Sequence, residues 1–416
     1  VVALIVANTG AYEAFLGFWH TEVGVFFGDG FAGMSLGHVI NDIFMAIFFL
    51  LVGLEVKYEL TVGELTNIRQ ALLPIVAAVG GVLAPIGIYL AFNATNPETA
   101  HGWGVPTATD IAFALGILAL LGNRVPNGVR VFLSTLAVAD DIIAILVIAI
   151  FYGHSPSMFW LAMAAVVLVV LVLMNRNHIY SLIPYLLVGA VLWYCVYMSG
   201  VHATIAGVLL ALAIPAQSQV KLERAPGWFA ARARKADERY DPGEPDIVQK
   251  EYLAELDEIG RVSRMAIPPI TRLDYRLHIP VYFFILPLFA FSNASVVLTG
   301  MDPLSIVTNP VTIGVFCGLL FGKPLGIFLA SWGAVRTGLA ELPEGATWRM
   351  LLAVACLGGI GFTMSLFVDS LAFTDPDLVD RGKIAILMGS LAAAVVGCLL
   401  ILIFSGKNRR TRQGGR

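Results

Sequence analysis

The chain has 416 residues, of which 58% are hydrophobic and only 13% are charged. Soluble domains carry charge on roughly a quarter of their residues, so this composition excludes an ordinary soluble protein and indicates an all-α integral membrane protein without a soluble catalytic domain. The formal net charge of −3 does not by itself indicate a partner, and we expect no nucleic acid to bind.

The chain begins with a short apolar segment, residues 1–7, that cannot span a membrane alone. We expect this segment to be the end of a first helix whose beginning is missing. The next segment carries a weak hairpin pattern, in which residues 23–27 turn at 28–30 into Phe31.

Apolar runs of about 20 residues, the length that crosses a hydrocarbon core of ~30 Å as a helix, then recur along the chain. Together with the first helix they predict about twelve transmembrane helices. The runs lie near residues 36–56, 71–92, 107–121, 129–151, 157–174, 181–199, 201–215, 279–298, 309–332, 347–371 and 383–404.

Lys and Arg collect in alternate loops, as they do in cytoplasmic loops. The loops at 11–35, 93–106, 152–156 and 299–308 contain neither residue, whereas the intervening loops and the tail contain most of them. This alternation predicts that both termini lie in the cytoplasm. It also divides the chain into helices 1–8 (1–215), a charged cytoplasmic connector (216–277), helices 9–12 (278–406) and a basic cytoplasmic tail (407–416).

The connector is the one long polar segment. Residues 217–276 contain eleven basic and eleven acidic residues, so they form no simple patch for anionic lipids. We interpret the segment as a solvated linker with one amphipathic helix resting on the bundle; a regulatory module is the alternative. The helix is predicted by apolar residues at helical spacing, namely Ile247, Tyr252, Leu256, Ile259 and Val262.

Charged residues inside the spans need a reason, because each costs at least ~2.5–3.5 kcal/mol there. Asp42 and Asp369 lie nearer the outer ends of their spans, where we expect water to reach them. The deeper charges are Asp110, Asp140, Asp141 and Lys323.

Adjacent residues on a helix point about 100° apart, so Asp140 and Asp141 cannot face one partner in the same way. Lys323 lies at similar depth and is the expected partner of one of them. An ion-pair network that only stabilises the bundle is the alternative. Three carboxylates against one ammonium leave an excess of negative charge, however, which a cation or protons must neutralise. This excess favours a transport site.

Two spans carry residues that interrupt helices. Pro106, Thr107 and Thr109 precede Asp110 in one span, and Gly358, Gly359 and Gly361 fall within another. Interrupted spans in corresponding positions of two halves point to a transporter site, and Asp110 and Lys323 could neutralise the exposed helix ends. Alternatively, the glycines only allow close packing, as expected for the glycines at 314, 318, 322 and 326.

At these residues the sequence resembles the NhaA family of Na+/H+ antiporters, over nearly the whole chain. The resemblance implies an inverted-repeat fold whose fourth and eleventh helices are interrupted and cross at the middle of the membrane. The motifs that carry it lie at 7–10, 41–42, 48–57, 108–116, 140–141, 199–204, 322–326 and 358–365.

The resemblance also implies roles for individual residues. Asp141 would bind the cation as Na+, with Asp140 beside it and able to pair with Lys323, while Thr109 and Asp110 would lie at the helix crossing. A pH-responsive cluster on the cytoplasmic side would contain Glu55, Glu59, Asp274 and His278. Tyr275 stands where the family often has His, a departure that affects the expected pH set point.

The predicted function is therefore exchange of Na+ or Li+ for H+ across the bacterial plasma membrane, by a pH-regulated transporter that is not an enzyme and needs no cofactor. A buried carboxylate can hold a cation or a proton but not both, and a like-charged neighbour helps it to hold the proton. Two carboxylates releasing protons per Na+ would move net charge, which predicts electrogenic exchange. The expected partners are Na+, Li+, H+ and the lipid bilayer, with a second copy of the chain as a further candidate.

Three other functions are less well supported. An organic-anion symporter could use Lys323 for its anion, but the excess of carboxylates argues against this. An intramembrane aspartyl protease needs two aspartates that flank a peptide bond, which adjacent residues on one helix cannot do. An ATP-driven pump with a phosphate loop is excluded at Gly322-Lys323, because Cys317 replaces the required glycine and Pro324 follows.

Overall fold

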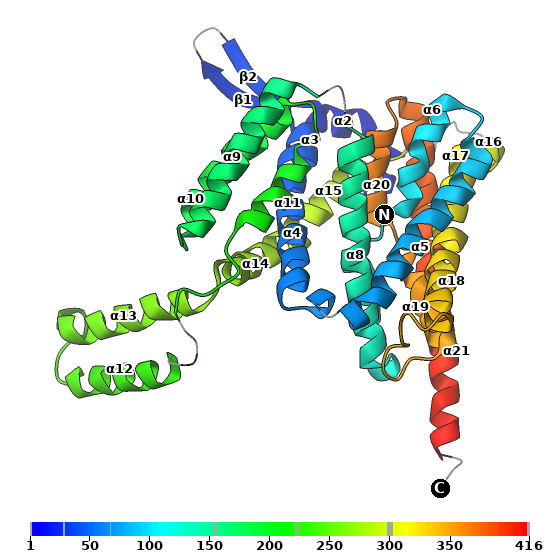
Figure 1. Ribbon diagram of the computed structural model, residues 1–416. Coiled ribbons are helices and arrows are strands. Elements are labelled where there is room, and N and C mark those ends of the chain that lie inside the picture. The colour runs from blue at the N-terminus through cyan, green and yellow to red at the C-terminus, as the bar shows by residue number, and fades with distance from the viewer. Residues whose placement is uncertain are drawn as a thin grey trace.

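The computed structural model describes residues 2–27, 30–66, 68–153, 156–220, 223, 225–297 and 303–413. Figure 1 shows a bundle of helices with a two-stranded hairpin at one end and a pair of helices projecting from the other. We call these the hairpin end and the connector end.

The segment before the first long helix contains α1 (Val2–Ala7), α2 (Tyr12–His20), β1 (Glu22–Phe27) and β2 (Gly30–Ser35). The strands pair antiparallel, with Glu22 opposite Ser35 and Phe27 opposite Gly30, which confirms the predicted hairpin. Residues 28 and 29 of its predicted turn lie outside the described part of the chain.

The helices up to the connector are α3 (Leu36–His38), η1 (Val39–Phe44), α4 (Met45–Thr61), η2 (Glu64–Thr66), α5 (Ile68–Asn93), α6 (Pro97–Ala100), η3 (His101–Thr107), α7 (Ile111–Leu120), η4 (Gly122–Arg124), α8 (Asn127–Phe151), α9 (Met158–Arg176), α10 (Leu182–Met198) and α11 (Thr204–Ala213). The connector contains α12 (Ala225–Arg239), η6 (Asp246–Val248) and α13 (Lys250–Ala266). The remaining elements are α14 (Pro269–Pro280), η7 (Val281–Ile285), α15 (Leu286–Asn293), α16 (Pro303–Thr308), α17 (Pro310–Cys317), η8 (Gly318–Gly322), α18 (Lys323–Arg336), α19 (Trp348–Gly358), α20 (Phe362–Ala372) and α21 (Pro376–Gln413).

Among the described residues, 8 helices are long and apolar enough to cross a membrane, or 9 when the bent pair α19 and α20 counts as one span. The shorter apolar helices α10 and α11 fall in two further predicted ranges. These elements account for every predicted range from residue 36 onward. The remaining predicted helix corresponds to α1, whose 6 residues rise only ~9 Å.

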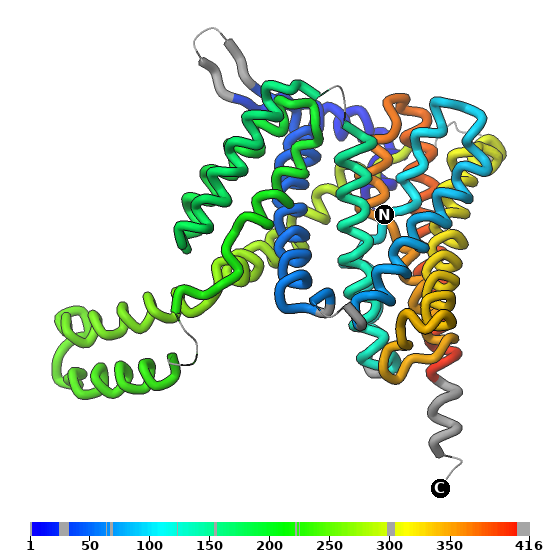
Figure 2. The backbone as a smooth tube through the Cα atoms, viewed as in Figure 1, coloured from blue at the N-terminus to red at the C-terminus, as the bar shows by residue number. Residues whose placement is uncertain are grey.

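Glycines allow α5 to approach α17, η8 and α18 closely, although these segments are far apart in the sequence (Figures 1 and 2). A Cβ at Gly326 would overlap the backbone of Gly80, and one at Gly322 would lie 2.8 Å from Pro85 Cα. The glycine spacing in this span therefore serves helix packing, as expected. This packing buries Lys323, the residue that follows Gly322.

The connector differs from the expected single helix. Helices α12 and α13 pack against each other and extend away from the bundle (Figure 1). Glu255 of α13 joins them, accepting hydrogen bonds from Arg232 at 2.6 Å and Arg239 at 2.9 Å. The apolar spacing predicted only one helix because it reports an apolar face, whereas charged side chains also hold these two helices together.

The contact between α12 and α13 should weaken in acid. The hydrogen bond and charge of Arg232 lower the pKa of Glu255 below its usual value of 4.5. A carboxyl whose pKa is lower in the folded state contributes stability above its unfolded pKa, and that contribution is lost as the pH falls through the folded pKa. Spin labels on the outer faces of α12 and α13 should therefore move apart as the pH falls below the usual pKa of a glutamate. Glu255→Gln should show the larger separation already at neutral pH. A separation that stays constant in acid would contradict this account.

Candidate ion-binding site

Both predicted helix interruptions are present. The first separates η3, which ends at Thr107, from α7, which begins at Ile111. The second separates α19 from α20, whose axes differ by 47°. Proline and threonine at the first break, and glycine at the second, disfavour a continuous helix there.

The two breaks pack against each other and satisfy each other's backbone groups. Asp110 N–H donates to the Ile360 carbonyl at 2.7 Å, and the Thr109 hydroxyl donates to the Gly358 carbonyl at 2.9 Å. A Cβ at Gly361 would lie 3.1 Å from the Ala108 carbonyl oxygen, so glycine also permits the close approach. Gly358, Gly359 and Gly361 thus serve both as interruption and as packing, the two interpretations that the sequence left open.

Asp110 caps two helices at once. Its carboxylate accepts from Phe113 N–H of α7 at 3.2 Å and from Thr363 N–H of α20 at 3.0 Å, and the Thr363 hydroxyl also donates to it. Helix N-termini carry partial positive charge, so this position compensates the negative charge of Asp110. Ser390 of α21 adds a cap to α20 by accepting from Gly361 and Phe362 N–H. Ser390 was not predictable, because a single serine in an apolar span shows no pattern.

Asp140 and Lys323 form a buried ion pair. Lys323 Nζ lies 2.5 Å from Asp140 Oδ2 and also donates to the Thr109 hydroxyl. All three side chains are buried: Lys323 is 0% exposed, Thr109 is 1% exposed and Asp140 is 2% exposed. Helix α18 thus supplies the cation that neutralises the first aspartate of α8.

Asp141 faces a different environment from its neighbour. Its side chain lines a narrow pocket, together with Thr109 and Asp110. The pocket extends along α4 to Glu55 and along η7 to Tyr282, toward the connector end. The two adjacent aspartates therefore point in different directions, as their helical positions predict: Asp140 contacts the Lys323 ammonium, and Asp141 faces the pocket. The other lining residues are Phe48, Val52, Ile111, Ala112 and Met364.

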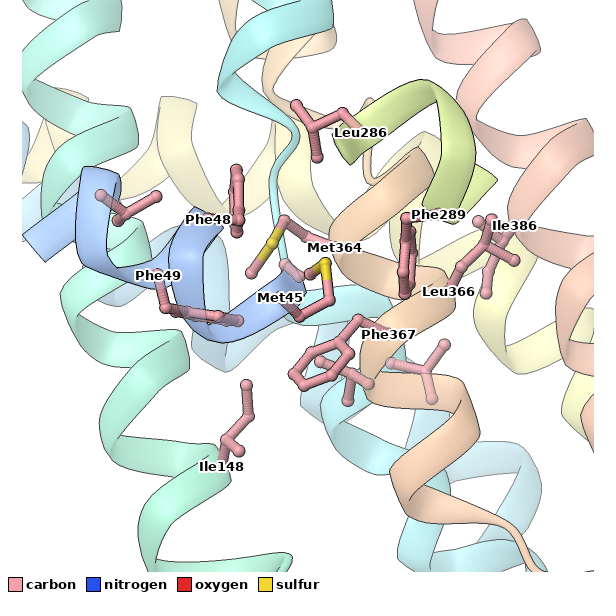
Figure 3. Close-up of a cluster of buried hydrophobic side chains, with 14 of the residues drawn as sticks. Met45, Phe48, Phe49, Ile148, Leu286, Phe289, Met364, Leu366, Phe367 and Ile386 are labelled. Atoms are coloured by element: carbon pink, nitrogen blue, oxygen red, sulfur yellow. The ribbon is translucent and has the colours of Figure 1, made fainter. Parts of the chain in front are cut away.

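An apolar cluster borders this pocket and continues toward the hairpin end. Figure 3 shows Phe48 and Phe49 of α4 facing Met364 and Phe367 of α20, with Phe289 of α15 beside them. The rings of Phe49 and Phe367 lie 5.5 Å apart, centroid to centroid. Since Phe48 and Met364 also line the pocket, the pocket ends at this cluster.

The predicted pH-responsive residues gather around Tyr282 and Glu55. The Tyr282 hydroxyl donates to Glu55 Oε1 at 3.3 Å, and its ring lies 4.6 Å from that of His278. Asp274 interacts electrostatically with both Glu55 and His278, and Glu59 interacts with Glu55. Tyr282 was not among the predicted residues, because a tyrosine in an apolar run is ordinary.

Two predicted features differ in the structure. Asp369 is 0% exposed, so the expectation that water reaches it is wrong. Asp42, for which the same was expected, is only half-buried, and its carbonyl accepts from Trp193 Nε1 at 3.3 Å. Tyr275 is 71% exposed on α14 and does not join the cluster around Tyr282. Nor do the described residues include a group of three or more His, Cys, Asp or Glu side chains placed to hold a metal ion.

Comparisons with known proteins agree with one another. A family model described as Na+/H+ antiporter 1 matches residues 1–401. A protein of Wolinella succinogenes named Na(+)/H(+) antiporter NhaA is 42% identical over 407 residues, which cover 97% of this chain and 88% of that protein. A protein of the same name from Helicobacter pylori strain 26695 is 44% identical over 404 residues, covering 96% and 90%.

Solved structures also include a match to this chain. It is the sodium proton antiporter MjNhaP1 from Methanocaldococcus jannaschii at pH 8, with a TM-score of 0.46 and 14% identity. The match covers 89% of this chain and 86% of that chain.

Proposed function

The chain belongs to the Na+/H+ antiporter 1 family, and from this premise we propose that Na+ or Li+ competes with protons for Asp141 in the pocket beside the first helix break. The observation that supports this most directly is the distribution of charge. Lys323 neutralises Asp140, and two helix ends compensate Asp110. Asp141 is left facing the pocket without a comparable partner among the described residues, so a mobile cation or a proton must neutralise it.

The pocket offers the ligands that a small hard cation prefers. Na+ and Li+ favour oxygen ligands, by the same preference that governs hard divalent ions. The Asp141 carboxylate, the Thr109 oxygen and backbone oxygens of the interrupted segments are the candidates for this set. Binding a proton at Asp141 removes the charge that attracts the cation, so occupancy by one excludes the other.

We propose that the two adjacent aspartates act as one proton-binding pair. Two carboxylates on adjacent residues behave as a coupled pair, whose proton affinities belong to the pair. When Asp140 takes a proton it releases Lys323, and when the pair loses protons one cation replaces two of them. The exchange then moves net charge and responds to the membrane potential.

The cluster around Glu55 and Tyr282 is the proposed pH-responsive element. Glu55 lines the pocket itself, and Glu59, Asp274 and His278 lie around it. Protonation of these groups adds positive charge beside the proposed route of the cation. Their titration would therefore change the rate at which cations reach Asp141.

We further propose the orientation in the membrane. The connector end would face the cytoplasm with both termini, because most Lys and Arg residues lie on that side, and the membrane would be the bacterial inner membrane. Exposed apolar side chains of α9 and α10 would contact lipid. The paired strands at the hairpin end are the surface on which a second copy could dock.

The experiment that tests this function uses everted membrane vesicles with a preformed pH gradient, followed with a pH-sensitive dye. Adding NaCl or LiCl should collapse the gradient and choline chloride should not, because only the small cations fit a carboxylate site. The rate should change when a membrane potential is imposed, which tests the electrogenic exchange. No collapse at any pH from neutral to alkaline would contradict the proposed function.

A further inference from the structure

A second isolated carboxyl lies outside the proposed ion site. Asp369 is on α20, which rises ~9 Å toward the hairpin end between Thr363 and Asp369. Its side chain is 0% exposed, and neither carboxyl oxygen has a hydrogen-bond partner among the described residues.

The groups around Asp369 are committed to other partners. Tyr89 of α5 and Tyr152 after α8 interact with it electrostatically, but their hydroxyls donate to the carbonyls of Thr99 and His101. Two charged residues of α21, Lys383 and Asp380, also interact with Asp369 electrostatically. They pair with each other, since Lys383 Nζ lies 3.6 Å from Asp380 Oδ1. None of these groups donates a hydrogen bond to Asp369.

The backbone of α21 packs tightly against the same carboxyl. A Cβ at Gly382 would overlap Asp369 Oδ1, so glycine is required for the carboxyl to occupy this position. The position therefore holds the carboxyl group closely while offering it no donor.

An ionised carboxylate in such a place would be costly. Desolvation of a buried ion costs several kcal/mol even after relaxation, and here no hydrogen bond offsets it. A neutral carboxyl group avoids most of this cost. We propose that Asp369 is a separate proton-binding site, which carries a proton in this conformation and exchanges it with the solution at the hairpin end.

The surroundings indicate the side from which the proton is exchanged. A second pocket, with about 1020 Å³ of empty space open to solvent, lies at the hairpin end and is lined by His101, Tyr152 and Phe373. The backbone carbonyl of Asp369 accepts a hydrogen bond from Phe373 N–H. Asp369 therefore lies one helical turn before Phe373, which lines this pocket. Toward the other end of α20, Met364 lines the pocket of Asp141, and Phe367 of the apolar cluster in Figure 3 follows Met364 on the helix before Asp369 is reached.

This placement makes Asp369 a sensor of the proton concentration at the hairpin end. A conformation that opens this end would wet Asp369 and let it ionise, whereas the conformation described here keeps it neutral. The role rests on the proposed exchange function. The protonation state of Asp369 does not depend on that function, and it can be measured without any transport assay.

Infrared spectroscopy of the purified full-length protein tests the proposal. At neutral pH without Na+, the difference between the spectra of the wild type and Asp369→Asn should contain a protonated-carboxyl band. This Asp369-dependent band is distinct from the band of the proton proposed on Asp141, which both proteins retain. Asp375→Asn, at an exposed carboxyl lining the same outer pocket, is the matched control and should leave the band unchanged. Lys383→Gln should also keep the band, because a proton rather than Lys383 neutralises Asp369.

The possible results separate the alternatives. A spectrum of Asp369→Asn that matches the wild type would overturn the proposal. It would also be overturned if the Asp369-dependent band disappeared, like the band of Asp141, when NaCl is added, since Na+ would then be the occupant. If Asp369→Asn does not fold, Asp369→Glu should shift the frequency of the band, and an unshifted band would again overturn it. Wild-type protein that fails to exchange Na+ would contradict the proposed function and leave this measurement intact.

Discussion

Replacing Asp141 by Asn should abolish Na+-driven proton exchange while the protein remains folded. Asparagine has nearly the shape of aspartate but cannot release a proton or supply a full negative charge. Asp141 lines the pocket and does not form the Lys323 ion pair, so its replacement breaks no buried pair. The vesicle assay should therefore show no collapse of the pH gradient on addition of NaCl, at wild-type amounts of protein in the membrane.

Two controls make this result specific. Asp375→Asn removes an exposed carboxyl that does not line the pocket of Asp141 and should retain exchange. The thermal stability of Asp141→Asn in detergent should match that of the wild type within a few degrees. Sodium-dependent proton movement in Asp141→Asn would show that another group carries the exchange.

Replacing Lys323 by Met should destabilise the protein by ~3–5 kcal/mol, the usual effect of removing one partner of a buried ion pair. Methionine retains much of the length and apolar volume of the lysine side chain, so loss of packing contributes little. The cost arises because Asp140 remains buried at 2% exposure without the ammonium that lies 2.5 Å from it. Thermal or denaturant unfolding in detergent measures the loss.

The double variant Lys323→Met with Asp140→Asn provides the decisive comparison. Neutralising both partners removes the uncompensated charge, so most of the lost stability should return. Full stability of the single Lys323→Met variant would show that Asp140 is already neutral and that the ion pair contributes nothing. A double variant as unstable as the single one would assign the loss to packing around α18 instead.

The elements that the sequence predicted well are those whose cause is local. Apolar run length determines which segments can cross the membrane, and every predicted range from residue 36 onward contains an apolar helix. Proline, threonine and glycine disfavour a regular helix wherever they cluster, so both breaks were predictable. The pairing of Lys323 with an aspartate followed from depth alone, because opposite charges in a dry environment must meet.

Other features depend on contacts between distant segments. Tyr282 joins the cluster around Glu55 only because η7 packs beside α4, and nothing in its own span distinguishes it. Hydropathy placed Asp369 near the end of a span and suggested water. The structure instead covers it with α21, where Gly382 leaves just enough space for the carboxyl.

The sequence by itself determined that this protein is a helical membrane protein and where its helices break. It also determined which charged residues lie so deep in the membrane-spanning segments that they indicate a function. These properties follow from composition and spacing, because transfer into a hydrocarbon layer depends on each segment alone. Only the tertiary structure decided which aspartate meets Lys323, which one faces the pocket, and which carboxyl has no partner. Those outcomes depend on helix rotation and packing. Adjacent helical residues point about 100° apart, so Asp140 forms the ion pair with Lys323 while Asp141 lines the pocket.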